Sequence, residues 1–348
     1  MPQSLKIVIP MAGWGTRMRP HTWSKPKPLV SVAGKASLDH LMATFNTLPN
    51  SFDVEYVFIV GPHLGEIQIP AYIAKNYPEI TAHYIVQTEM KGQSHAIYLT
   101  KEHLKGPIMM VFSDTLIETD FSFLDKEKSD LIAWVKAVPD PRRFGVAVVD
   151  GAGKISRLVE KPDSIENNLA LVGCYYFKES TDLVSAIEEQ FEQKIMLKNE
   201  FFLADAINIM LKNGTKGRIE AIGDYWLDTG TIDATLKTNI AMLERFNVKD
   251  LNPSLGSKVS GENVKIIAPV AIHHSAKIKN SKIGPNVTIS ADCEISDSQI
   301  DDSIIEMGAQ IHASVLRHSL IGKNALVERV GNQDAPAMLN IGDNSWIK

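Results

Sequence analysis

The chain has 348 residues, of which 44% are hydrophobic and 22% charged, and its formal net charge is −5. This length and composition predict a folded protein of two domains and argue against a general nucleic-acid-binding or acidic-membrane-binding surface. Any site for a polyanion must therefore be a local group of basic residues. The two cysteines, Cys174 and Cys293, lie far apart, which argues against a disulfide framework and favours a reducing compartment.

The N-terminus has no basic stretch followed by a long apolar segment, so we expect no signal peptide. No apolar run approaches the ~20 residues that a membrane span needs. We therefore expect a cytoplasmic protein that binds neither membranes nor nucleic acids.

Short apolar runs alternate with helical patterns in the first two thirds of the chain. Strands are predicted at 5–9, 54–60, 82–87 and 108–114. Between the first two, the spacing of Leu38, Leu41, Met42 and Phe45 predicts one buried helix face. Such alternation is typical of βαβ units and a mainly parallel sheet, which places the fold in the α/β class.

Two further elements follow in this part of the chain. Residues 144–161 predict a hairpin whose turn is Asp150-Gly151-Ala152-Gly153. A closing helix is then predicted, with Ile232, Leu236, Ile240 and Leu243 on one face.

The last hundred residues follow a different pattern, with apolar residues six apart. The residues with this spacing are Val264, Val270 and Ala276, then Ile283, Ile289 and Ile295, then Ile305 and Ile311, and finally Ile321 and Val327. This hexapeptide period predicts a three-sided parallel β-helix with coils of about eighteen residues. The alternative, a β-sandwich, does not predict a six-residue spacing of apolar residues. Because turn-forming residues cluster at 246–258, we predict two domains, 1–248 and 249–348.

The segment MAGWGTRMRPHTWSKPKPLVSVAGK (11–35) follows the first predicted strand and concentrates positive charge. We call it the signature loop. Its glycines can turn backbone N–H groups toward phosphate oxygens, although the spacing is not that of a Walker A motif. Arg17 offers a planar fork, and Lys27, held between Pro26 and Pro28, offers a point charge. The segment therefore predicts a polyphosphate site.

The order G-x-G-T-R-x-R-P-x-T-x-x-x-P-K-P-L-x-x-V-x-G-K closely resembles the signature of the sugar-1-phosphate nucleotidyltransferases, such as glucose-1-phosphate thymidylyltransferases and uridylyltransferases. The resemblance implies a Rossmann-like domain with a mixed, mainly parallel sheet, followed by a left-handed parallel β-helix. It also implies an enzyme that joins a sugar 1-phosphate to a nucleoside triphosphate and releases pyrophosphate. The sugar phosphate is already largely dianionic at neutral pH, so this transfer needs cations and positioning more than a general base.

The resemblance assigns roles to individual residues of this sequence. Arg17 would hold the leaving phosphates, and Lys27 would lie between the α-phosphate and the sugar phosphate. Asp114 and Asp228 would bind Mg²⁺, the expected cofactor. Ser113 stands where the family usually has glycine before this aspartate, which is a local departure from the pattern. The catalytic set is Arg17, Lys27, Asp114 and Lys161, and the nucleotide-binding set is Ala12, Gly13, Gly15, Thr16, Arg17, Gln87 and Gly92.

The same resemblance covers the base and the sugar. Gln87 can both accept from and donate to a uracil or thymine ring, so we expect UTP or dTTP. An alternative pair is GTP with mannose 1-phosphate. The sugar phosphate, most simply glucose 1-phosphate, would bind at Gly145, Glu160, Lys161 and Gly173, and the stretch KNEFFLAD (198–205), with Glu200, would contribute to sugar recognition. Gly145 and Gly173 could instead mark strand bulges.

Two rival functions remain open. Hexapeptide β-helices also occur in acyltransferases, and His273, His274, His312 and His318 lie in the predicted β-helix. A regulatory relative could bind nucleotide sugars without turnover. Whichever function applies, the flat sides and open ends of a β-helix predict a homo-oligomer.

Overall fold

The computed structural model describes residues 3–246, 255–256 and 261–348. The predicted boundary between 248 and 249 lies outside these residues. The chain packs as two compact units, which we call the sheet unit (Met1–Gly13 and Leu41–Trp226) and the β-helix unit (Trp14–His40 and Leu227–Lys348). Most of the signature loop therefore belongs to the β-helix unit. Among the described residues, no helix has both the length and the apolarity to cross a membrane.

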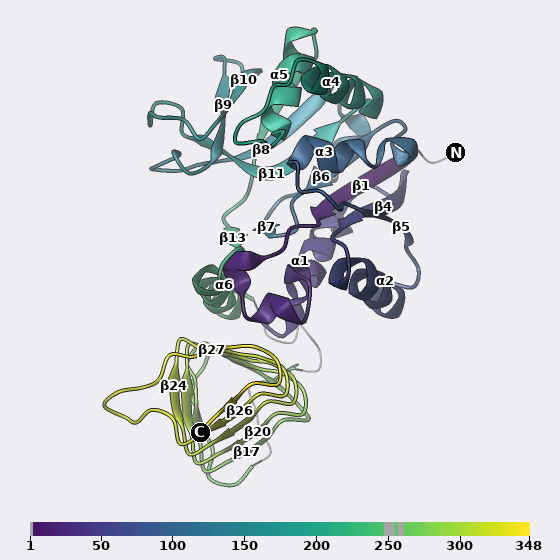
Figure 1. The fold of residues 1–348 in the computed structure, drawn as a ribbon. Coiled ribbons are helices and arrows are strands. Elements are labelled where there is room, and N and C mark those ends of the chain that lie inside the picture. Colours follow the sequence, from purple (N-terminus) through teal and green to yellow (C-terminus); the bar gives the residue numbers. More distant parts are fainter. Residues whose placement is uncertain (1–2, 247–254, 257–260) are drawn as a thin grey trace. The chain divides into compact units, whose positions relative to one another are not determined.

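The sheet unit is built on one mixed sheet of nine strands (Figure 1). The strands are β1 (Gln3–Met11), β4 (Phe52–Val60), β5 (Thr81–Val86), β6 (Ile108–Val111), β8 (Leu131–Ala137), β9 (Gly145–Val149), β10 (Ile155–Glu160), β11 (Leu169–Phe177) and β12 (Gly217–Ala221).

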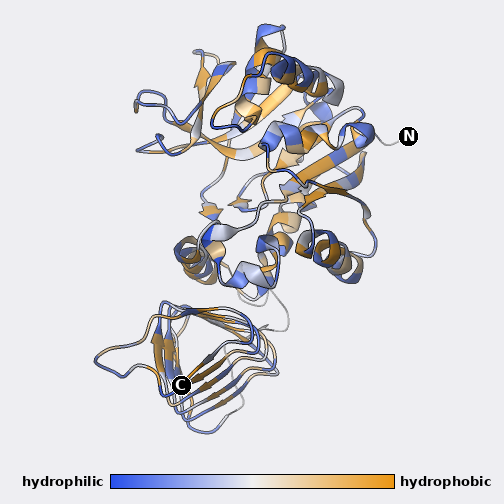
Figure 2. Cartoon of the chain, viewed as in Figure 1, coloured by the Kyte–Doolittle hydropathy of each residue, from blue (hydrophilic) through white to orange (hydrophobic). Residues whose placement is uncertain are grey.

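The order of the main path is β10-β9-β11-β6-β1-β4-β5, with β8 joined to β11 and β12 joined to β8. The neighbours β6, β1, β4 and β5 run parallel, as the alternating pattern predicts, whereas β11 runs antiparallel to β6, β8 and β9. Leu5, Ile7, Val8 and Ile9 of β1 are fully buried, as expected for a parallel strand covered on both faces. Figure 2 shows that hydrophobic residues predominate along the central strands.

One predicted strand ends early. Strand β6 stops at Val111 and not at Asp114, because the backbone leaves the ladder at Phe112. The Phe112 N–H donates to the Gly173 carbonyl, and the Thr115 N–H donates to the Phe112 carbonyl to form a turn. The predicted hairpin is confirmed: β9 and β10 pair antiparallel through the turn at residues 150–153.

The remaining elements connect these strands or lie in the β-helix unit. The helices are α1 (Ser37–Thr44), α2 (Leu64–Asn76), α3 (Gln93–Tyr98), α4 (Ser180–Glu192), α5 (Leu203–Lys212) and α6 (Ile232–Arg245), and the 3₁₀ turns are η1 (Thr16–Met18), η2 (His21–Trp23), η3 (Lys27–Leu29), η4 (Phe45–Thr47), η5 (Lys101–His103) and η6 (Leu124–Lys126). The short strands outside the main sheet and the coils are β2 (Ser31–Val32), β3 (Lys35–Ala36), β7 (Thr115–Ile117) and β13 (Trp226–Asp228). The two predicted helices are confirmed as α1 and α6.

The C-terminal coils form three sheets of short parallel strands, consistent with a left-handed β-helix (Figure 1). The first sheet contains β16 (Val270–His273), β19 (Val287–Ile289), β22 (Ile304–Ile305), β25 (Leu320–Ile321) and β27 (Asn340–Ile341), and β14 (Leu255–Gly256) joins its edge. The second contains β15 (Lys265–Ile266), β18 (Lys282–Ile283), β21 (Gln299–Asp301) and β24 (Val315–Arg317). The third contains β17 (Lys277–Lys279), β20 (Glu294–Ser296), β23 (Gln310–His312), β26 (Leu326–Glu328) and β28 (Trp346–Ile347).

The coils vary in length around the predicted eighteen residues. Successive strands of the third sheet are related by steps of 17, 16, 16 and 20 residues, through the pairs Lys277–Glu294, Glu294–Gln310, Gln310–Leu326 and Leu326–Trp346. Some corners advance the buried position by five residues and not six. Such a corner lies between Ile278 and Ile283, where Asn280 adopts a left-handed conformation (φ 46°) that asparagine tolerates well.

Candidate active site

The signature loop folds back on itself at Gly15. This residue has a φ of 58° and precedes η1, which begins at Thr16. A Cβ atom at Gly15 would stand 2.9 Å from the Thr22 Cγ2 and 3.3 Å from the Lys27 Cβ. The Thr22 hydroxyl also donates to the Gly15 carbonyl at 2.8 Å. Glycine is therefore required here by both backbone conformation and close packing, and the fold-back brings Lys27 beside the glycine turn.

Arg17 and Asp228 meet at Gly230. A Cβ atom added at Gly230 would stand 2.8 Å from the Asp228 Oδ1 and 3.4 Å from the Arg17 Nη2. The Gly230 N–H donates to the Asp228 Oδ1 at 2.7 Å, and the Asp228 carbonyl accepts from the Thr238 hydroxyl of α6 at 2.8 Å. The start of α6 thus positions an exposed carboxylate beside an exposed guanidinium.

The end of β1 supplies the other predicted phosphate-binding residues. Ala12 is buried, and its carbonyl would lie only 2.7 Å from a Cβ at Gly61, so the chain after β4 approaches it closely. Gly13 is exposed, and among the described residues no atom lies within 4 Å of the place a Cβ would take. The backbone at Gly13 is consequently open to a ligand.

Asp114 lies three residues beyond the end of β6 and directly before β7. It is half-buried at the carboxyl edge of a central strand, where open α/β sheets commonly bind ligands. Asp114 belongs to the sheet unit and Asp228 to the β-helix unit. Both are carboxylates, the ligand type that Mg²⁺ prefers in proteins.

Gly173 lies at an irregularity in β11. The pairing register with β8 shifts between Leu171 and Tyr175, and Gly173 has a φ of 80°. A Cβ atom there would stand 2.3 Å from the Phe112 ring. The bulge interpretation therefore accounts for this glycine, and its role in sugar binding stays a prediction.

The predicted base segment forms a compact group in the sheet unit. The buried Gln87 follows β5, and its Nε2 lies 3.4 Å from the Gly92 carbonyl and 3.2 Å from the His95 Nδ1. Gly92 has a φ of 97°, and a Cβ there would stand 2.5 Å from the Phe201 carbonyl oxygen. The close approach at Gly92 is thus to Phe201. His95, which the sequence pattern does not single out, orients Gln87.

The predicted sugar residues Gly145, Glu160 and Lys161 lie together at one end of the β9–β10 hairpin. Gly145 pairs with Glu160, and a Cβ at Gly145 would stand 2.9 Å from the Glu160 Oε2. Lys161 follows directly with a φ of 48°, and its N–H donates to the Phe144 carbonyl at 3.0 Å. Burial raises the pKa of Glu160, against the lowering effect of Lys161.

The start of α5 adds two residues to this group, which the sequence analysis includes in the stretch 198–205 but does not single out. The Lys161 Nζ lies 5.9 Å from the centre of the Phe202 ring. Asp205 raises the pKa of Glu160 through charge repulsion, and burial raises the pKa of Asp205 itself. Both residues fall in the stretch 198–205, where the sequence drew attention to Glu200, an exposed residue. No local pattern separates Asp205 from Glu200.

A second carboxylate group lies in the β-helix unit. In the described part of the chain, potential metal-ligand atoms converge at His21, Glu306 and Asp343. The Lys25 ammonium forms ion pairs with both carboxylates, so a side chain already supplies the cation there. With the Lys25 ammonium paired to both carboxylates, this group does not act as a metal site.

Comparisons with known proteins identify the family and the fold of the chain. The family model described as "Nucleotidyl transferase" matches residues 6–245. A "Glucose-1-phosphate thymidylyltransferase" of Streptomyces griseus is 26% identical, covering 98% of this chain and 98% of its own, and a protein of the same name from Streptomyces antibioticus is 29% identical, covering 99% of each. A crystal structure of "UDP-glucose pyrophosphorylase complexed with UDP-glucose" has a TM-score of 0.58 and 20% identity, covering 71% of this chain and 100% of its own.

The matched residues span well over half of the chain and include the signature loop, both predicted magnesium ligands and the hairpin residues. The likeness to the solved structure extends to the fold. On these findings the chain belongs to the nucleotidyl transferase family.

Proposed function

We propose that the protein is a sugar-1-phosphate nucleotidyltransferase that joins a hexose 1-phosphate, specifically glucose 1-phosphate, to dTTP or UTP and releases pyrophosphate. The observation that carries the proposal is the fold-back of the signature loop, which sets Lys27 beside the glycine turn while Arg17 lies next to Asp228. The names of the Streptomyces relatives support the choice of glucose 1-phosphate and dTTP.

In the proposed reaction a sugar phosphate oxygen attacks the α-phosphorus, and the bond from the α-phosphorus to the bridging oxygen of pyrophosphate breaks. The attacking dianion needs no proton removed. The barrier comes from bringing two anions together, so fixed cations supply the main catalytic effect. Lys27 offsets charge at the α-phosphate, Arg17 holds the departing pyrophosphate, and Lys161 holds the sugar phosphate.

In this proposal the group around Gln87 binds the base, and the group around Glu160 binds the sugar. The Gln87 nitrogen donates toward the Gly92 carbonyl and the His95 Nδ1, and in this proposal the side-chain oxygen accepts the N3–H of uracil or thymine. Glu160 accepts hydrogen bonds from the sugar hydroxyls, and the absence of a side chain at Gly145 leaves its carboxylate in place.

Asp114 and Asp228 would hold Mg²⁺. When bound, the ion would neutralise charge on the triphosphate oxygens. The Asp228 carboxylate is suited to this because one of its oxygens is fixed by the Gly230 N–H.

The test is a screen for pyrophosphate release with Mg²⁺, in which dTTP, UTP, GTP, ATP and CTP are each combined with glucose, galactose, mannose and N-acetylglucosamine 1-phosphates. We expect the highest kcat/KM for glucose 1-phosphate with dTTP or UTP. Turnover of GTP with mannose 1-phosphate above all others would refute the proposed specificity, and no release in any combination would refute the activity.

A further inference from the structure

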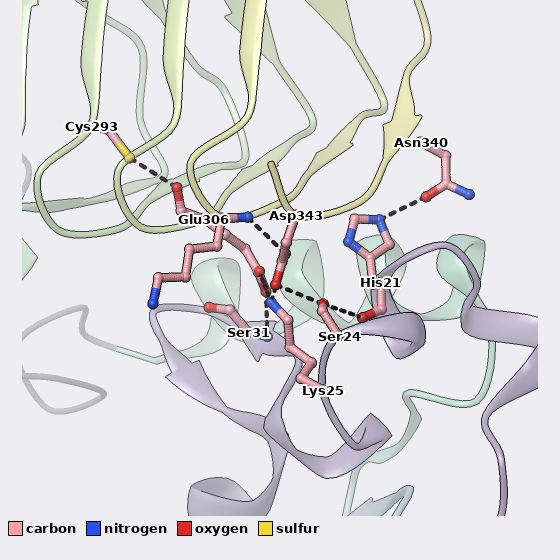
Figure 3. Close-up of polar contacts among 9 residues, drawn as sticks. His21, Ser24, Lys25, Ser31, Cys293, Glu306, Asn340 and Asp343 are labelled. Carbon is pink, nitrogen blue, oxygen red and sulfur yellow. Dashed lines mark hydrogen bonds and ion pairs between the residues drawn. The ribbon is translucent and has the colours of Figure 1, made fainter. Parts of the chain in front are cut away.

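The signature loop carries charged groups on two sides. Lys27 lies beside Gly15, whereas Lys25, two residues earlier, points to the C-terminal coils (Figure 3). Lys25 is 281 residues from its partner Glu306 in sequence, yet both belong to the β-helix unit. The coils therefore contact the segment that presents Lys27.

The Glu306 carboxylate binds this segment at two points that flank Lys27. Its Oε2 forms an ion pair with the Lys25 Nζ, and its Oε1 accepts from the Ser31 N–H at 3.2 Å (Figure 3). Lys27 begins η3, which lies between these two points. One carboxylate thus fixes both ends of the turn that orients the lysine.

The contact is buried and charged. The Glu306 side chain is 6% exposed and the Lys25 side chain 13% exposed. Burial lowers the pKa of Lys25, but the charges of Glu306 and Asp343 outweigh this effect and raise it, so the ammonium stays protonated. Removing Glu306 takes away one of the two carboxylates that compensate this buried ammonium, and such a loss is costly in a buried site.

Other β-helix residues hold the loop on either side of Lys25. Asp343 lies 3.1 Å from the Lys25 Nζ and accepts from the Ser24 hydroxyl at 2.7 Å. The His21 Nε2 donates to the Asn340 Oδ1 at 2.7 Å, and the Asn340 Nδ2 donates to the Arg19 carbonyl at 3.2 Å.

An apolar cluster and α6 complete the attachment. Met18 and Val30 of the loop pack with Leu236 of α6 and with Ile304 and Leu320 of the coils. The loop is thus packed and hydrogen-bonded to the β-helix along most of its length.

We propose that Glu306 is a positioning residue for nucleotidyl transfer, which acts through Lys25 and Ser31 to hold η3 and therefore Lys27 in the reactive orientation. The catalytic part of this inference rests on the proposed function of Lys27. The β-helix is then part of the machinery that shapes the active-site loop, in addition to any role in self-association.

The test compares Glu306→Gln with Glu294→Gln. Glu294 is a matched control because it also pairs with a lysine of the coils, Lys277, at 2.9 Å, but the pair is exposed and does not touch the loop. Amide hydrogen exchange is measured on the full chain without substrate. We expect the amides of residues 29–31 to exchange at least about tenfold faster in Glu306→Gln, with the coil amides at 282–305 unchanged, because only a local restraint is lost.

Steady-state kinetics provide the second readout. We expect Glu306→Gln to lower kcat at least about tenfold while each KM stays within about threefold, because a misplaced Lys27 weakens transition-state contacts more than substrate binding. Glu294→Gln should match the wild type in both readouts. Wild-type exchange at 29–31 and wild-type kcat in Glu306→Gln would overturn the inference.

A second variant covers the case in which Glu306→Gln does not fold. Lys25→Met/Glu306→Met/Asp343→Asn removes all three charges of the buried group together, a change that buried ion pairs and triads often tolerate. We expect it to fold and to keep the faster exchange and the lower kcat; recovery of both to wild-type values would overturn the inference. If the wild type turns over no substrate, the proposed function fails, while the exchange comparison still decides whether Glu306 holds the loop.

Discussion

Replacing Lys27 by alanine tests the charge that the proposed reaction depends on most. The Lys27 Cβ packs 3.3 Å from the place of a Cβ at Gly15, and alanine keeps this atom. The substitution therefore removes only the flexible stem and the ammonium, and it leaves the fold-back of the loop intact. Lys27 is half-buried, so we expect the free energy of unfolding to change by less than ~1 kcal/mol.

The effect on turnover should be much larger. Loss of one positioned donor to developing charge in a site that excludes water costs about 3 kcal/mol, which corresponds to about a hundredfold in kcat. Lys27→Arg keeps the charge but replaces a compact ammonium by a wider planar group, so we expect only partial recovery.

The assay is pyrophosphate release under saturating substrates, with thermal unfolding of the same preparations. Lys237→Ala serves as a control, because it removes one exposed lysine of α6 whose ion pair, with Asp233, is also exposed. A Lys27→Ala protein that unfolds at the wild-type temperature and retains kcat within about threefold would refute the catalytic role of this lysine. Parallel losses of stability and activity would show instead that Lys27 supports the fold.

Three further substitutions test other parts of the structure. Asp228→Asn retains an acceptor for the nearby N–H but loses the charge, so the Mg²⁺ concentration for half-maximal activity should rise several-fold; an unchanged titration would remove Asp228 from the metal site. Gly92→Ala should destabilise the protein by about 1–3 kcal/mol more than Gly214→Ala in denaturant unfolding. The two glycines have similar φ values (97° and 100°), but of the two only Gly92 faces neighbouring backbone. Equal losses of stability would contradict the packing argument. The hydrogen bond from Lys6 lowers the pKa of Glu55 from 4.5 to about 2. Glu55→Gln should therefore reduce the free energy of unfolding in urea by its full amount above pH 4.5, and this difference from the wild type should disappear as the pH falls toward 2. A difference that does not depend on pH would exclude this linkage.

Much of the fold follows from local patterns in the sequence. Short apolar runs predict β1 and β4, because a parallel strand covered on both faces is mostly apolar. The six-residue spacing predicts the coils, because one inward-facing position occurs on each side of a coil. The signature loop is equally local, since Gly15, Arg17 and Lys27 lie within one short segment. The sequence therefore suffices for the two folds and for the charged residues of the candidate site.

Tertiary structure decides the contacts that join distant segments. The ion pair between Lys25 and Glu306 and the packing of Gly92 against Phe201 join residues that are far apart in the sequence. Local hydrophobic periodicity does not predict such contacts. Five-residue corners shorten the middle coils, because left-handed residues such as Asn280 turn the chain early, whereas the last step, from Leu326 to Trp346, takes 20 residues. Local sequence thus determines which residues carry charge and which are buried, whereas chain closure determines which of them meet, because a contact between distant residues depends on the path of all the residues between them.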